Sequence, residues 1–194
     1  MRDIVHISDN CLVTLIASLL ETPHKEVGGF LIGRDDKCLI RGNRTDCISL
    51  ETVHPVQTAK SGKSYWAPGN MRAYRRIIDS ISAMGLNIVG EYHSHVENVP
   101  ELSEEDKEYI EEELDNLQGY NIHISYWIEI VLNIQKQVYT RKQKQKSTCR
   151  YLTKKVVYKL KNIRNPYIGY TITIGTYSIT LSDHAFREVK THIP

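Results

Sequence analysis

The sequence predicts a mixed α/β (α+β) domain built from packed layers of helices and strands. Segments with apolar residues at helical spacing alternate with short strand-like segments over the first 140 residues, as expected for a mixed layer structure. The chain has 194 residues, of which 41% are hydrophobic and 25% charged. That length and composition suit a soluble globular protein with a buried core.

The first elements follow from short local patterns. Ser8 opens a helix-start signal and leucines then recur at helical spacing, so we predict a helix that ends near Pro23. The small and apolar residues of 26–33 predict a strand, and strands continue over 38–40 and 45–53. Later elements, in chain order, are a loop or flap over 55–63, a helix over about 68–84, a strand over 86–93, a helix over 103–117, and a strand pair over 122–134 and 137–140.

Residues 141–194 differ in character from the preceding chain. Between 141 and 164 there are ten basic residues and no acidic one. Further on, polar and apolar residues alternate around Gly175, which predicts a β-hairpin, and a short helix is expected from Ser182. We therefore divide the chain into a core over 1–140 and a basic C-terminal extension. The sequence leaves open whether this extension pairs with the core sheet, forms a homodimer or recruits a substrate.

Cysteine usage and hydropathy favour a cytoplasmic protein. The cysteines are Cys11, Cys38, Cys47 and Cys149. They are scattered and form no CxxC pair, so we interpret all four as reduced thiols. The longest apolar run, 11–20, is far short of the roughly 20 residues of a membrane span. The N-terminus lacks the apolar core of a signal peptide, so a cytoplasmic location without a membrane is expected.

The most informative stretch is 91–106, which reads EYHSHVENVPELSEED. His93 and His95 lie two residues apart on a predicted strand, so both imidazoles project from one face. Ser103 is a natural N-cap of the next helix, and Asp106 lies in its first turn. Two imidazoles and one carboxylate can hold a catalytic zinc that keeps a fourth position open for water.

Other patterns of metal and cysteine chemistry are absent from the sequence. There is no HExxH, no HxE followed by PCxxC as in nucleic-acid deaminases, and no cysteine in a papain-like context. A lone HxH pair is weak evidence for a metal site, and Asp106 at a predicted helix start strengthens that evidence. Ser94 points to the opposite strand face from the histidines, so we expect it to be structural.

The constellation resembles the JAMM (MPN-plus) metalloprotease family. The matching residues are Glu26, His93, Ser94, His95, Ser103 and Asp106. Seven residues separate the second histidine from the serine and two separate that serine from the aspartate, as in the family motif. Val96 and Glu91 depart from the residues common in the family. The resemblance covers about residues 10–140 and implies an MPN-like fold, with a curved mixed β-sheet flanked by helices.

The resemblance also implies roles for the matching residues. It implies one zinc ion held by His93, His95 and Asp106, with Glu26 as general base for the zinc-activated water and Ser103 as hydrogen-bond donor to the oxyanion. The implied reaction is hydrolysis of an amide or isopeptide bond after the C-terminus of a ubiquitin-like or sulfur-carrier protein. The expected partner is therefore a ubiquitin-like modifier or its conjugates.

Two alternatives come from other classes of protein. One is a non-catalytic MPN scaffold, as in relatives that have lost their ligands, although every motif residue is present here. The other is nucleic-acid binding by the basic segment 141–164, where Tyr151, Tyr158 and the following Tyr167 interleave with lysines and could stack on bases. No recognised nucleic-acid motif accompanies that segment, so a nucleic-acid partner is not expected. An acidic modifier could dock on the same basic surface.

Overall fold

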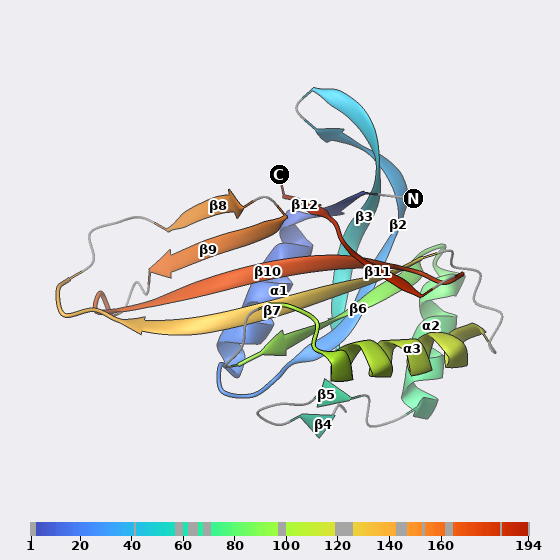
Figure 1. Cartoon of the computed structure of the whole chain (residues 1–194), viewed down its shortest axis with the longest axis horizontal. Helices are drawn as coiled ribbons and strands as arrows, with labels where there is room; N and C mark the ends of the chain where they lie inside the picture. Colours follow the sequence, from blue (N-terminus) through green and yellow to red (C-terminus); the bar gives the residue numbers. More distant parts are fainter. Residues whose placement is uncertain are drawn as a thin grey trace.

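A computed structural model shows a large mixed β-sheet with helices on both faces (Figure 1). The structure describes residues 3–40, 42–56, 60–61, 66–67, 71–96, 100–118, 126–142, 147–152, 154–161, 165–182 and 184–193. The helices are α1 (Asp9–Glu21), α2 (Met71–Ala83) and α3 (Glu104–Gln118). The strands are β1 (Ile4–Ile7), β2 (Gly28–Ile40), β3 (Asn43–Pro55), β4 (Lys60–Ser61), β5 (Trp66–Ala67), β6 (Asn87–His95), β7 (Tyr126–Val138), β8 (Thr148–Leu152), β9 (Lys155–Lys161), β10 (Ile168–Thr180), β11 (Ala185–Glu188) and β12 (Lys190–His192).

The ten-stranded sheet has the order β12-β1-β3-β2-β6-β7-β10-β9-β8, with β11 added beside β10. β6 and β7 run parallel in its centre, and β2 and β10 flank them in antiparallel orientation. β4 and β5 form a separate two-stranded sheet. The mixed α+β class is therefore confirmed. Most of the predicted loop or flap over 55–63 lies outside the described residues.

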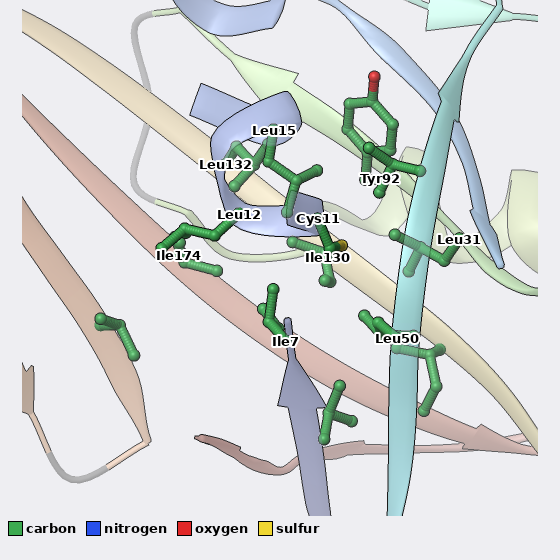
Figure 2. Packing of buried hydrophobic residues seen from close by; sticks show 14 of the residues in the cluster. Ile7, Cys11, Leu12, Leu15, Leu31, Leu50, Tyr92, Ile130, Leu132 and Ile174 are labelled. Carbon is green, nitrogen blue, oxygen red and sulfur yellow. The ribbon is translucent and has the colours of Figure 1, made fainter. Parts of the chain in front are cut away.

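Helix α1 packs on one face of the sheet, where most of the apolar core lies. Ser8 caps it, since its Oγ accepts a hydrogen bond from Cys11 N at 3.3 Å. Leu12 and Leu15 then pack against strand residues such as Leu50 and Ile130 (Figure 2). The predicted helix from Ser8 is thereby confirmed, and α2 and α3 are confirmed with small shifts in their bounds. None of these described helices combines the length and the apolar composition that a membrane crossing requires.

A second apolar cluster lies on the opposite face, where α2 and α3 pack. It joins Ile81 of α2 and Leu114 of α3 to Phe30, Trp127 and Ile179 of the sheet. The strands thus bury apolar side chains on both faces, because successive residues point to opposite sides. The functional residues described below share this second face.

Strands β2 and β3 form one long antiparallel hairpin in place of the separate short strands predicted. Its register sets Cys38 opposite Thr45 and Cys47 opposite Asp36, so the two cysteines are diagonal neighbours. They form a disulfide with a Cα–Cα distance of 6.0 Å. The prediction that all four cysteines are reduced is therefore wrong for this pair. Hairpin pairing, which the cysteine spacing alone does not reveal, brings the two together.

The C-terminal strands belong to the same sheet as the rest of the chain. β10 pairs with β7 from Ile168 to Thr180 without a break at Gly175, so the hairpin predicted there is wrong. The helix predicted from Ser182 is also wrong, because β11 occupies that part of the chain. β7 is a single strand where a strand pair was predicted. The division into a core and an appended extension is not confirmed, since β8, β9 and β10 extend the central sheet.

Candidate metal centre

His93 and His95 lie at the end of β6, on the face of the sheet where α3 packs. The pairing of β6 with β2 shifts register between Leu31 and Ile32, so β6 carries one extra residue at this point. Such a β-bulge changes which face the following side chains occupy. Beyond it, Tyr92 packs in the α1 cluster and the two histidines face α3.

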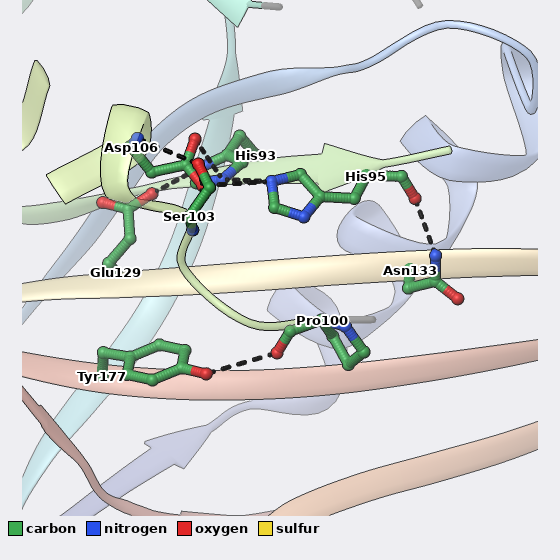
Figure 3. A network of polar contacts seen from close by, with 8 residues as sticks. All are labelled: His93, His95, Pro100, Ser103, Asp106, Glu129, Asn133 and Tyr177. Atoms are coloured by element: carbon green, nitrogen blue, oxygen red, sulfur yellow. Dashed lines mark hydrogen bonds and ion pairs between the residues drawn. The ribbon is translucent and has the colours of Figure 1, made fainter. Parts of the chain in front are cut away.

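Close pairing of β6 with β7 fixes the position of the histidine strand. A Cβ atom on Gly90 would lie 1.8 Å from the backbone oxygen of Ile128, so only glycine allows this approach. The parallel register places His95 beside Asn133. The Asn133 side-chain amide donates a hydrogen bond to the His95 backbone oxygen at 2.9 Å, which fixes the end of β6 (Figure 3).

Ser103 and Asp106 are tied together at the start of α3. Ser103 Oγ accepts a hydrogen bond from Asp106 N at 3.1 Å. In return, Asp106 Oδ2 accepts hydrogen bonds from Ser103 N at 2.7 Å and from Ser103 Oγ at 2.6 Å. This reciprocal pattern is a capping box in which aspartate replaces the usual glutamate or glutamine. The predicted N-cap role of Ser103 is therefore confirmed, and the cap holds the carboxylate in one orientation.

The structure brings the three predicted metal ligands together (Figure 3). His93 Nε2 lies 3.1 Å from His95 Nε2 and 3.5 Å from Asp106 Oδ1. His95 Nε2 lies 3.3 Å from Asp106 Oδ2. One ligand atom from each residue lies within 4.8 Å of the others, so the group could hold a metal ion. The ligand types fit, because two imidazole nitrogens and a carboxylate oxygen are common ligands of zinc.

The electrostatics of this group favour a positive charge. Burial by itself lowers the pKa of His93, but hydrogen bonds with Asp106 and Glu129 outweigh it and raise the pKa to about 10. Burial acts to raise the pKa of Asp106, but the two histidines hold that pKa well below its ordinary value. Both shifts reflect carboxylates that stabilise a cation between the imidazoles. A bound metal ion would supply that charge and displace a proton.

Glu26 lies close to the same group, in the short segment before β2. Its side chain is 8% exposed. Burial raises its pKa, and the charges of His95 and His93 act in the opposite direction, which places the carboxyl within electrostatic reach of the ligands. Ser94 holds this segment, since its Oγ accepts from Val27 N and its N donates to Val27 O, each at 2.9 Å. The structural role predicted for Ser94 is therefore confirmed.

The family model for prokaryotic homologs of the JAB domain matches residues 8–144. The chain belongs to this family. The solution structure of protein DSY2949 from Desulfitobacterium hafniense is similar, with a TM-score of 0.56 at 14% sequence identity. That similarity covers 98% of this chain and 92% of that chain, so it shows a common fold that includes the C-terminal strands. Among curated proteins, none matches the chain.

Within this JAB-family site, sequence reasoning missed Glu129. Its Oε1 lies 2.8 Å from His93 Nδ1 and accepts a hydrogen bond when that nitrogen carries the proton. This contact leaves Nε2 of His93 directed at the other ligands, as carboxylate partners of metal-binding histidines do. The sequence held one usable signal. Glu129 and Asn133 interrupt the otherwise apolar run 127–134, and a buried polar residue in such a strand requires a partner.

A cluster of buried glutamates lies behind the ligand group. Glu91 is aligned with Glu129 in the parallel register, and both are almost fully buried. Burial raises the pKa of Glu91 well above its ordinary value, and the charges of Glu129 and Glu113 add to the shift. The raised pKa favours the protonated form of Glu91 relative to an exposed glutamate. The departure from the family pattern noted at Glu91 thus places a second buried carboxyl beside the partner of His93.

Proposed function

We propose that this JAB-family chain is a metal-dependent hydrolase that cleaves an amide or isopeptide bond after the C-terminus of a ubiquitin-like or sulfur-carrier protein. The observation that carries this proposal is the grouping of His93, His95 and Asp106 beside the buried carboxyl of Glu26. A fold alone does not imply an activity, and here the argument rests on the site.

In this proposal His93, His95 and Asp106 hold one zinc ion. A zinc ion bound there would polarise the scissile carbonyl and make water a nucleophile at neutral pH. Three protein ligands leave a coordination position open, which is the arrangement of catalytic rather than structural zinc sites. Glu129 keeps His93 in the tautomer that presents Nε2 to the ion.

Glu26 is the proposed general base. It takes a proton from the attacking water and transfers that proton to the leaving amine. Burial raises the pKa of its carboxyl, which makes the carboxylate a better proton acceptor than an exposed glutamate. The two hydrogen bonds between Val27 and Ser94 hold the base beside the histidine strand.

Ser103 is the proposed donor to the oxyanion of the tetrahedral intermediate. Its hydroxyl hydrogen now points to Asp106 Oδ2 at 2.6 Å. The side chain is exposed, and rotation about its side-chain torsion would redirect the hydroxyl to a substrate oxygen. The helix cap would lose one hydrogen bond, and the oxyanion would gain one. Loss of a single donor of this kind costs about 10²–10³ in kcat.

The proposed substrate class has an extended tail that ends in Gly-Gly, and such a tail can bind through backbone hydrogen bonds as an added strand. Lysines of the 141–164 segment offer a surface for an acidic modifier. A cytoplasmic location stays part of the proposal, although the Cys38–Cys47 disulfide removes one of its premises.

The test uses several ubiquitin-like modifiers, each joined to a lysine-containing peptide by an isopeptide bond. Zinc-loaded wild type is expected to release the peptide. Glu26→Gln should lower the rate by about 10²–10⁴, the usual contribution of a general base, while zinc content stays the same. Glu21→Gln, at the exposed end of α1, is the matched control and should retain full activity.

Two results would contradict the proposal. If zinc-loaded wild type cleaves none of the conjugates, the protease function is wrong and the non-catalytic scaffold is favoured. If Glu26→Gln cleaves as fast as wild type, the assignment of the base is wrong.

A further inference from the structure

The loop that leads into α3 lies directly on β10, a C-terminal strand beyond the family match. This loop comprises residues 100–103, and it ends at the serine that caps α3 and holds Asp106. On the β10 side, Gly175 and Tyr177 make the contacts with this loop. These two residues lie two apart in the strand and therefore share one face. Figure 3 shows Tyr177 reaching Pro100 beneath the metal ligands.

Gly175 allows the loop to approach the strand. A Cβ atom at this position would lie 2.5 Å from the Pro100 backbone oxygen, closer than any real side chain tolerates. The obstacle is backbone rather than a flexible side chain, so an alanine would push the loop away from β10. Gly175 is buried in the middle of a continuous strand, and its backbone makes no turn there. Close packing of the loop is therefore the physical reason for a glycine at this place.

Tyr177 anchors the same loop by a hydrogen bond. Its hydroxyl donates to the Pro100 backbone oxygen at 3.3 Å. Burial raises the pKa of Tyr177 to about 12, with Glu188 and Glu101 adding to the shift, so the hydroxyl keeps its proton. The neighbouring Leu102 packs against the apolar cluster under α3, together with the Tyr177 ring. The Tyr177 hydroxyl also hydrogen-bonds the backbone of Leu102, so hydrogen bonds and apolar packing together hold the loop.

A third contact comes from β9. Lys155 Nζ donates to Glu101 Oε1 at 2.7 Å. The glutamate side chain is 62% exposed, so this ion pair contributes less than the buried contacts. All three contacts reach the loop from strands that the family model does not match.

We propose that Gly175 and Tyr177, with a smaller contribution from Lys155, are positioning residues that set the place of Asp106 relative to the two histidines. The histidines come from β6, but the carboxylate comes from a helix whose first residues follow this loop. Displacement of the loop moves the carboxylate away from the imidazoles and opens the ligand group. The inference rests on metal binding in the proposed function and is independent of the substrate.

Metal affinity measured without substrate tests this proposal. Zinc and Co²⁺ are titrated into metal-free protein, and the Co²⁺ absorption spectrum reports ligand geometry. Gly175→Ala is expected to weaken metal binding by about 10-fold or more and to change the spectrum, as for other outer partners of metal ligands. Tyr177→Phe, which removes only the hydroxyl and its hydrogen bonds to the loop, should weaken metal binding by about 5-fold.

Matched controls lie on the same strand. Gly169→Ala introduces a crowded Cβ near Tyr139 and Leu160, away from the loop, and Tyr170 packs against the α1 cluster. Gly169→Ala and Tyr170→Phe should bind both metals with wild-type affinity and an unchanged Co²⁺ spectrum. These two control variants distinguish a specific effect on the metal ligands from a general destabilisation of β10.

Wild-type affinity and an unchanged spectrum in Tyr177→Phe would overturn the proposal, even if Gly175→Ala fails to fold. A loss of affinity in the controls equal to that in the loop variants would also overturn it. If wild type itself binds no metal, the proposed function fails instead, so the two failures are distinguishable.

Discussion

The two faces of β6 and β7 differ sharply although the same two strands build both. On the α1 side, Tyr92, Ile128 and Ile130 are fully buried in an apolar cluster. On the α3 side, histidines, glutamates and an asparagine stand beside the apolar Trp127 and Val131, and these polar residues are also largely buried. Close packing on the α1 face stabilises the protein. On the α3 face, burial of polar groups costs free energy unless each group has a hydrogen-bond partner.

The difference shows how a fold supports a polar site without losing its core. The alternation of side chains lets one strand pair serve both purposes. The bulge in β6 assigns the histidines to the face that α3 covers. Adjacent residues on one strand can therefore be changed to affect either stability or metal binding, and the following predictions use that separation.

The largest effect is expected from loss of a ligand on the polar face. His95→Ala removes one of three ligands, so the purified protein should no longer retain one equivalent of zinc after dialysis. Elemental analysis of metal content measures this directly. His24→Ala, in an exposed turn, is the control and should keep its zinc. Stoichiometric zinc in His95→Ala would place the metal elsewhere.

A change on the apolar face should affect stability alone. Ile130→Ala leaves a cavity in the α1 cluster and is expected to lower the free energy of unfolding by about 2–5 kcal/mol. Ile130→Val should cost about 0.5–1.5 kcal/mol. Urea unfolding measures both, and zinc affinity of the folded variants should equal that of wild type. A large loss of zinc affinity would show that the two faces are not independent.

A change at Glu129, the neighbour of Ile130, should weaken zinc binding without lowering stability. Glu129→Gln removes the charge that holds His93 and is expected to weaken zinc binding by about 10–100-fold. The amide is similar in shape, so the free energy of unfolding of the metal-free protein should not fall as it does in Ile130→Ala. Competition with a chelator gives the affinity. Unchanged affinity in this variant would refute the orienting role of Glu129.

The smallest effect concerns a second histidine pair, at the far edge of the sheet. His6 Nδ1 and His192 Nδ1 lie 2.9 Å apart between β1 and β12. Burial lowers the pKa of His192, and the charge of His6 adds to the shift. His192 also lines a pocket together with Tyr151, Lys154, Lys155 and Lys190, and none of these residues supplies a carboxylate. Carboxylates raise the pKa of His93, whereas no carboxylate contributes to the pKa shift of His192.

The sign of the resulting pH dependence follows from linkage. Below the ordinary histidine pKa of 6.5, the unfolded chain binds a proton that folded His192 resists, so stability is full above that pH and falls below it. Thermal unfolding between about pH 7.5 and about pH 5.5 should show a small decrease of Tm that His192→Asn reduces. An identical pH profile in the variant would contradict this.

The metal ligands could be predicted from the sequence because they are close in the chain and follow fixed spacings on one strand and one helix start. Glu129 could not be paired with His93 in that way, because 36 residues separate them and only the parallel register of β6 and β7 joins them. Its presence in an apolar strand was the available signal.

The C-terminal strands were harder to predict for a different reason. Alternation around a glycine fits both a hairpin and a continuous strand, and the contact that explains Gly175 comes from Pro100, far away in sequence. The Cys38–Cys47 bond likewise depends on hairpin register and not on spacing. Local periodicity indicated the elements, but tertiary contacts decided their limits and partners.

The central claim is that one metal ion in this ligand group supports hydrolysis after a ubiquitin-like C-terminus. Metal-free protein is titrated with zinc while release of a reporter fused after the Gly-Gly end of a ubiquitin-like domain is followed. Activity is expected to rise linearly and level off at one equivalent, and Glu26→Gln should remain inactive throughout. Activity that is independent of zinc, or absent at every zinc concentration with each modifier tested, would contradict the account.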